Sequence, residues 1–323
     1  MNRLHAAPCF ALALTVSASA SFAQTYPSQS IRMIVPYAAG GVTDLLGRLA
    51  GEHIKNKTGQ TVVIENRAGA GGNTGLAAVV NSAPDGATLG LAAVTNFSVN
   101  PFIYRSMPFD PMKDLVAIAP IAEGPQLLVV PASLPVRTLT EFVAWAKANP
   151  DKMNYGSAGT GSPNHLSTET FLRSAGIKAA HLPYRGAAPA VNDLLTGSLQ
   201  MMVIAPAALA GHVQTGSLRA LAAVAAKRLP GFPDVPTVAE QGLPAYDMAN
   251  WYGLVAPAGT PKPIIETLNR LIVSMADEPA IARQFDTLFM APMRVSPEAF
   301  AQVIRTDAPK WEKIVKDVGI TPE

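Results

Sequence analysis

The chain alternates short apolar runs with longer amphipathic stretches. Its first apolar run, Ile31–Val35, is rich in β-branched residues and is typical of a buried strand. A turn with Gly40 and Gly41 follows, and Thr43 or Asp44 can then cap an amphipathic helix. Further strands are predicted at 61–64, 88–94, 115–119, 127–130, 153–156, 179–184, 199–204, 219–224 and 251–256. Because helical patterns separate many of these runs, the sequence predicts an α/β protein with open sheets.

The pattern becomes helical toward the C-terminal end. Ile265, Leu268 and Ile272 form one apolar stripe, and a Ser296-Pro297 start leads into a last amphipathic helix. We expect three helices here with no strand between them, packed over an existing domain. The proline-punctuated segment 101–111 is expected to be a loop.

Length and composition fit a globular protein of two domains. The chain has 323 residues, of which 49% are hydrophobic and 15% are charged, so a large core is available and disorder is not expected. The formal net charge of +2 is small, and no basic block interrupts the chain. We therefore expect no nucleic acid partner.

Residues 1–23 are predicted to be a signal peptide. A short apolar stretch follows Arg3, and small residues precede a cleavage position after Ala23, with Ala20 as an alternative. The apolar stretch is too short to span a bilayer, so we expect an exported, soluble protein of the periplasm. The only cysteine, Cys9, lies in this segment, so the mature chain would have no thiol for disulfides or catalysis.

The sequence lacks the motifs of common catalytic and cofactor sites. None of the five histidines is paired at metal-ligand spacing, and the glycine loop at 67–75 lacks the lysine and the spacing of a nucleotide site. Ser157 and Ser162 have neither a neighbouring base nor a G-x-S-x-G elbow around them. We expect no metal, no cofactor and no enzyme activity.

Two loops have the composition of anion-binding sites. Loops 37–43 and 157–162 both contain glycines and both precede a helix, whose first N–H groups and positive dipole end attract anions. The second loop is richer in donors, because it carries the hydroxyls of Ser157, Thr160 and Ser162. The alternative is that both loops are ordinary strand-to-helix connections, and that His165 is a first-turn histidine with no role in binding.

Eight stretches, in this order, carry a resemblance to a known family: YPSQSIRMIVPYAAGGVTD, VVIENRAGAGGNTG, APDGATL, NYGSAGTGSPNHL, HLPYRGAAPAVNDLLTG, FPDVPTVAEQGLP, WYGLVAPAGTPKP and WEKIVKDVGI. They make the chain similar to the periplasmic substrate-binding proteins of tripartite tricarboxylate transporters, also called Bug (Bordetella uptake gene) receptors. The resemblance runs from Tyr26 to the C-terminus.

The resemblance implies a two-lobed periplasmic-binding-protein fold, in which two α/β domains close on a ligand like a Venus flytrap. It places one domain at 24–124 plus 253–323 and the other at 125–252, with crossings near 124–126 and 250–253. The implied first wall of the cleft contains Tyr37, Ala38, Gly40, Gly41, Thr43, Thr95 and Asn96. The implied second wall contains Ser157, Ala158, Gly159, Thr160, Ser162, His165, Arg185 and Ala205.

The implied ligand is a small organic acid, either a di- or tricarboxylate or an aromatic carboxylate, which a monomer would deliver to membrane permease subunits. Many relatives have an Asp-Asn pair where this chain has Ala205-Pro206. Since that carboxylate is missing, a plain organic acid is favoured over an amino acid. Two other functions stay open: a sensor of the same fold that acts on a signalling partner and, less favoured, a periplasmic enzyme.

Overall fold

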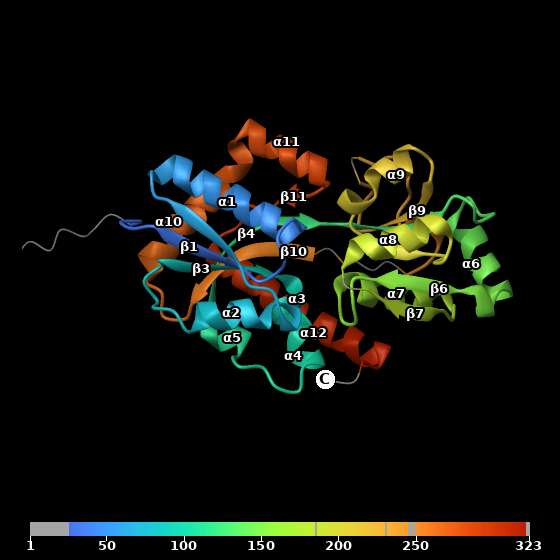
Figure 1. Cartoon of the computed structure of the whole chain (residues 1–323), viewed down its shortest axis with the longest axis horizontal. Helices are drawn as coiled ribbons and strands as arrows, with labels where there is room; N and C mark the ends of the chain where they lie inside the picture. Colours follow the sequence, from blue (N-terminus) through green and yellow to red (C-terminus); the bar gives the residue numbers. More distant parts are fainter. Residues whose placement is uncertain (1–25, 185, 230, 245–247, 249, 321–323) are drawn as a thin grey trace, which may run out of the picture.

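The chain forms two lobes that lie side by side (Figure 1). The computed structural model describes residues 26–184, 186–229, 231–244, 248 and 250–320. The predicted signal peptide and its cleavage position lie outside the described residues. Among the helices described, none is both long and apolar enough to cross a membrane.

The first lobe is built on a six-stranded sheet with the order β11-β4-β10-β3-β1-β2. The strands are β1 (Ile31–Val35), β2 (Val62–Asn66), β3 (Thr88–Ala93), β4 (Leu115–Gly124), β10 (Asn250–Pro257) and β11 (Ala291–Pro292). Strand β1 runs parallel to β2 and β3, whereas β10 runs antiparallel to β3 and β4. The carboxyl ends of β1, β2, β3 and β4 therefore lie at the same edge of the sheet, where ligands of open α/β sheets bind.

Helices cover both faces of this sheet, and alternate residues of β1 belong to two different cores. Met33 and Val35 belong to the core with α1 (Val42–Thr58), α10 (Lys262–Val273) and α11 (Pro279–Leu288). Ile34 belongs to the core that includes α2 (Asn73–Val80), α3 (Val94–Ser98) and α12 (Pro297–Val318). Short helices complete the lobe: η1 (Ala70–Gly72), α4 (Asn100–Ile103), α5 (Pro111–Asp114) and η5 (Ser274–Asp277).

The second lobe contains the sheets β8-β5-β9 and β6-β7, which a bridge between Tyr155 and Met201 connects. The strands are β5 (Gln126–Pro131), β6 (Asn154–Ser157), β7 (Ala180–Pro183), β8 (Met202–Ile204) and β9 (Leu218–Val224). The helices are α6 (Leu139–Ala148), η2 (Pro150–Lys152), α7 (Pro163–Ala175), α8 (Ala187–Thr196), η3 (Pro206–Ala208), α9 (Ala210–Gln214) and η4 (Ala239–Gln241). Because β5 is antiparallel to β8 and β9, those strands end where β5 begins, at the edge that faces the first lobe.

The lobes are joined by backbone and by a shared core. Strand β4 ends at Gly124 and β5 begins at Gln126, so Pro125 alone separates strands of the two lobes. The last helix, α12, packs against α3 and β4 of the first lobe and against α7 of the second. Its buried residues Trp311 and Val315 belong to a hydrophobic cluster that includes residues of both lobes.

Two predictions about the elements are wrong. Segment 101–111 is not a plain loop, because α4 occupies its start and α5 begins at Pro111, where the Asp110 carboxylate accepts a hydrogen bond from the Met112 N–H. The C-terminal helices do have a strand between them, since β11 pairs with β4 between α11 and α12. A two-residue strand is too short to leave a periodic signal in the sequence.

The predicted cap of the first helix is also wrong. Helix α1 begins at Val42 with Gly41 as its N-cap, and no side chain accepts a hydrogen bond there. The helix therefore begins earlier than Thr43 or Asp44, and its N-terminal turn emerges directly from the glycine turn.

Candidate functional site

Polar side chains that follow two neighbouring strands, β1 and β3, meet at the edge of the first lobe where these strands end. Tyr37 follows β1, while Thr95 and Asn96 lie in α3 immediately after β3. The Tyr37 hydroxyl lies 3.0 Å from the Thr95 hydroxyl, and the Asn96 amide donates to the Tyr37 hydroxyl (3.2 Å) and to the Gly71 carbonyl (2.9 Å). Burial raises the pKa of Tyr37, so its hydroxyl stays protonated at neutral pH. The structure thus brings three of the predicted residues together.

The glycine loop around Gly71, which lies in the segment 67–75 that lacks the features of a nucleotide site, completes this network. The Gly71 carbonyl also accepts a hydrogen bond from the Asn100 amide (3.0 Å), and Asn100 donates to the Asn73 side chain (2.8 Å). Asn73 and Asn100 are both buried. Nothing local in the sequence marks these asparagines, because their partners lie 25 or more residues away along the chain.

The turn before α1 exposes its backbone but already contains a carboxylate. Ala38, Gly40 and Gly41 are exposed. Asp44, which is only 2% exposed, accepts hydrogen bonds from the Gly40 N–H (2.9 Å) and the Arg48 guanidinium (3.0 Å). The Gly40 N–H is therefore not free for a ligand, and Thr43 is buried beneath the turn.

Asn66, at the carboxyl end of β2, ties this turn to the sheet. Its amide donates to the Tyr37 carbonyl (3.1 Å) and to the second oxygen of Asp44 (3.0 Å). Although burial opposes ionisation of Asp44, the hydrogen bonds from Arg48, Gly40 and Asn66 together hold its pKa below the usual value. Asn66 is not among the residues predicted from the sequence, although its position at a strand's carboxyl end could have indicated it.

The second loop, 157–162, is held by its own hydroxyls. The Ser157 hydroxyl lies 3.0 Å from the Gly159 carbonyl, and Ser162 donates to the same carbonyl (2.5 Å). Ser162 is also the N-cap of α7, because its oxygen accepts from the His165 N–H. Of the three hydroxyl residues predicted to bind an anion, Thr160 is the exposed one.

Behind this loop lies a stack of three aromatic rings, of which the sequence analysis identified only His165. The His165 and His181 rings are 4.0 Å apart, and the Tyr155 ring is 4.8 Å from His181. His165 Nδ1 accepts a hydrogen bond from the Gly161 N–H (3.0 Å), and His181 Nε2 lies 2.7 Å from the Ser157 hydroxyl. Both histidines therefore support the loop from behind.

Both histidines are neutral in this setting. Burial, and secondarily the neighbouring His181, lowers the pKa of His165 to about 4. Burial also lowers the pKa of His181. Because Nδ1 of His165 accepts a hydrogen bond from the Gly161 N–H, the neutral ring must carry its proton on Nε2.

The contact between Ser157 and His181 is buried within the lobe. Ser157 is fully buried, and its hydroxyl lies 3.0 Å from the Gly159 carbonyl and 2.7 Å from His181 Nε2, so the tautomer of His181 decides which of the two receives its proton. The nearby carboxylate of Glu169 is engaged by the Tyr155 hydroxyl at 2.5 Å. The described residues also contain no group of three histidines, cysteines or carboxylates that could hold a metal ion.

The second loop also contacts the first lobe. Gly161 has a φ of 74°, and a Cβ placed there would come within 2.4 Å of Cδ1 of Ile103 in α4. Ala205, half-buried, follows β8 as the N-cap of η3. Arg185 lies outside the described residues. The predicted second wall thus lies at the boundary between the lobes.

Comparison with known proteins decides the family. Residues 46–320 match the tripartite tricarboxylate transporter family receptor. The chain belongs to this receptor family. It is 34% identical to BugT of Bordetella pertussis over 320 residues, which cover 99% of this chain and 98% of BugT. The family expected from the sequence is confirmed.

Solved relatives confirm the two-lobed periplasmic-binding-protein fold. One is an R. palustris protein solved with adipate, with a TM-score of 0.85, 32% identity, and coverage of 92% of this chain and 100% of that chain. Another is MatC from Rhodopseudomonas palustris with bound malate, with a TM-score of 0.80, 30% identity, and coverage of 90% and 100%. The ligands of these two neighbours are dicarboxylates, and the receptor is a binding protein by family.

Proposed function

We propose that the protein is a periplasmic receptor that captures a small organic carboxylate between its lobes and delivers it to membrane permease subunits. The observation that supports this most is the pair of glycine turns, 37–43 and 157–162, which precede α1 and α7 at the facing edges of the lobes. Backbone N–H groups at helix starts suit carboxylate oxygens. The adipate and malate of the two neighbours have this chemistry.

The proposed cleft has one wall on each lobe. The first wall is the set of Tyr37, Ala38, Gly40, Gly41, Thr43, Thr95 and Asn96. The second is the set of Ser157, Ala158, Gly159, Thr160, Ser162, His165, Arg185 and Ala205. We place the lobes at 24–124 plus 253–323 and at 125–252. The passage of β4 into β5 at Pro125 supports the first boundary, whereas β10 begins at Asn250, three residues before the second boundary, in the sheet of the first lobe. Ligand would draw these two parts together.

A thermal-shift screen over di-, tri- and aromatic carboxylates tests this proposal, followed by calorimetric titration of the best acid. An acid at 100 times its Kd adds about 2.7 kcal/mol to the free energy of unfolding. Thr160→Ala should weaken binding by about ten- to a hundredfold, the effect of one hydrogen bond to a charged group. Thr306→Ala, which removes an exposed hydroxyl on α12, is the matched control.

Absence of stabilisation by every acid would contradict carboxylate capture, and chemical turnover of an acid would contradict a receptor without enzyme activity. Delivery is tested separately with membrane vesicles that contain the candidate permease. Uptake of labelled acid should require the receptor, and uptake that proceeds equally well without it would contradict this part of the proposal.

A further inference from the structure

A large cavity lies between the lobes, away from the proposed cleft. Its volume is about 850 Å³. The first lobe lines it with the end of α11 and with β11, the second lobe lines it with residues 225–229 and Gly231, and Pro125 lies between them. None of the predicted acid-binding residues that the structure describes lines this cavity.

The cavity and the proposed cleft lie on opposite sides of the crossing from β4 to β5. In the first lobe β11 is on one side of β4, whereas β10, β3 and β1 are on the other. In the second lobe β9 is on one side of β5, whereas β8 and, beyond it, β6 are on the other. The acid-binding turns follow β1 and β6, while the cavity is bordered by β11 and by the chain that leaves β9.

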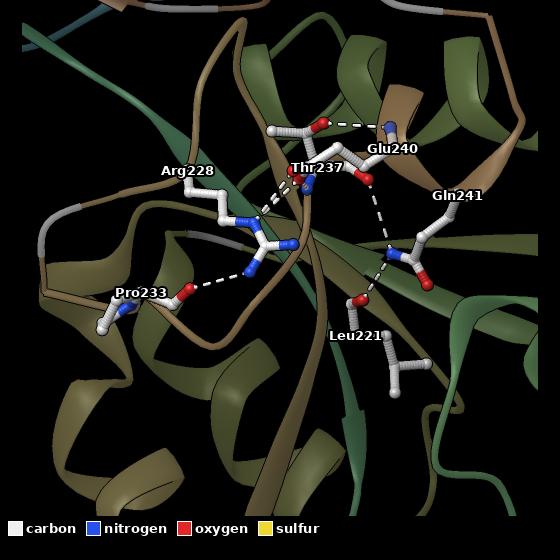
Figure 2. A network of polar contacts seen from close by, with 6 residues as sticks. All are labelled: Leu221, Arg228, Pro233, Thr237, Glu240 and Gln241. Atoms are coloured by element: carbon white, nitrogen blue, oxygen red, sulfur yellow. Dashed lines mark hydrogen bonds and ion pairs between the residues drawn. The ribbon is translucent and has the colours of Figure 1, made fainter.

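The cavity wall that follows β9 is fixed to the second lobe (Figure 2). Arg228 donates from Nε to both oxygens of Glu240 (3.0 Å each) and from Nη1 to the Pro233 carbonyl (3.1 Å). Glu240 also accepts from the Thr237 N–H (2.7 Å), and Gln241 donates to the carbonyl of Leu221 in β9 (2.9 Å). These contacts hold Arg228 and residues 233–241 to the second lobe.

One side chain of the first lobe crosses to this wall. Phe289, at the end of α11, has a φ of 55°, a left-handed conformation that is uncommon for a residue with a bulky side chain. Its ring packs beside Phe232 of the second lobe, with ring centroids 5.0 Å apart. A Cβ at Gly231 would come within 2.2 Å of the Phe289 ring, so the ring fills the space that a side chain there would need.

We infer that Phe289, Phe232 and Gly231 form a latch between the lobes that holds the acid-binding side open and so sets the apparent affinity for the acid. When two lobes pivot about Pro125 and the core shared through α12, separation on one side of this pivot brings them closer on the other. The latch is engaged while Ala38, Gly40, Gly41 and Thr160 are exposed. Closing the cleft therefore requires the ring contact behind the crossing to loosen.

The link to affinity is a population effect. The apparent Kd equals the Kd of the binding-competent arrangement divided by its fractional population. A contact made only in the open arrangement lowers that population, so its removal tightens binding without touching the ligand. This inference rests on the proposed function, because it assumes that acid binding accompanies closure.

Two substitutions disengage the latch from opposite lobes. Phe289→Ala removes the ring, and Gly231→Ala introduces a methyl group that the ring cannot accommodate. We expect either substitution to lower the Kd for adipate, used as the probe, about three- to tenfold, the range of one aromatic pair. Combining them should add little to either alone, since both act on one contact. Met112→Ala, an exposed apolar site on α5, is the control.

The distance between the lobes provides a readout that needs no ligand. Labels at Asn81→Cys in the first lobe and Thr196→Cys in the second, in a Cys9→Ser background, report this distance by spin–spin coupling; both positions are exposed. Without ligand, Phe289→Ala and Gly231→Ala should each shift the distribution from that of the parent protein toward the one that ligand produces.

The two readouts separate the latch from the proposed function. Unchanged distances in both variants, or weaker adipate binding in variants that unfold at the parent's urea midpoint, would overturn the latch. Shifted distances in a protein that binds no carboxylate would support the latch and overturn the proposed function. Phe289→Leu, which keeps an apolar side chain in the space, should restore most of the parent's distribution.

Discussion

Replacing His165 with asparagine should remove a large part of the acid sensitivity of the second loop. His165 is only 4% exposed, and its pKa is lowered to about 4 by burial and by the adjacent His181. In the unfolded chain the same side chain titrates near its model value of 6.5. Between these two values the unfolded chain binds more protons than the folded one, so stability falls as the pH falls through this window.

The size of the effect follows from the two pKa values. The full difference corresponds to about 3 kcal/mol, and about 2 kcal/mol of it is lost between pH 7.5 and pH 5.0. The structural reason is specific: a proton on Nδ1 would replace the acceptor that receives the Gly161 N–H. In His165→Asn the amide oxygen can take over as acceptor, and this side chain does not titrate.

Urea unfolding of the parent protein and of His165→Asn at pH 7.5 and pH 5.0 measures this difference. Carboxylates such as Asp44 also lose stabilising interactions in acid, but they do so in both proteins and cancel in the comparison. The parent should lose about 2 kcal/mol more than the variant over this range. Equal losses, within about 0.5 kcal/mol, would show that His165 is not held neutral by its surroundings.

Three further predictions concern the network around the two loops. Gly161→Val should weaken acid binding and lower the melting temperature, because its Cβ would approach α4 to 2.4 Å at a φ of 74°; an unchanged melting temperature would refute the close contact. Trp251→Phe removes the hydrogen bond from the indole to Asp307 (2.9 Å) and should lower the free energy of unfolding, measured in urea, by about 2 kcal/mol. A decrease below about 0.5 kcal/mol would show that this bond does not stabilise the fold. Asn66→Ala removes one of the hydrogen bonds to Asp44 and should raise the pKa of that carboxyl, which NMR titration measures. An unchanged pKa would show that Asn66 does not stabilise the ionised carboxylate of Asp44.

Much of the fold could be predicted because strands buried on both faces leave continuous apolar runs. The run Ile31–Val35 coincides with β1, and its length and composition distinguish it from a helix. The start of α7 was also readable, since Ser162 and Pro163 are favoured at the first positions of a helix. Strand β11 was not readable, because its two residues are held as a strand only by pairing with β4.

The candidate site also has one part that could be predicted from the sequence and one part that could not. The approach of Tyr37 to Thr95 and Asn96 follows from the rule that neighbouring parallel strands end at one edge, which needs only the strand positions. The support of the second loop by His181 could not be predicted, because it depends on the register between β6 and β7, which places Tyr155 opposite His181. Local sequence carries no information about that register.

The charge around the two turns suggests which of them governs affinity. In the first turn the Gly40 N–H already donates a hydrogen bond to Asp44, whose negative charge Arg48 partly neutralises. A carboxylate ligand would therefore have to bind the remaining backbone amides close to this negative charge. Among the described residues no carboxylate contacts the second turn: its Gly159 and Gly161 N–H groups are engaged by Ser157 and His165, and the histidines behind it are neutral. A monocarboxylate should therefore choose the second turn. The second carboxylate of a diacid can bind the remaining backbone amides of the first turn, but the negative charge of Asp44 repels it and reduces the binding free energy gained there. Substitutions in 157–162 should therefore weaken binding more than those in 37–43.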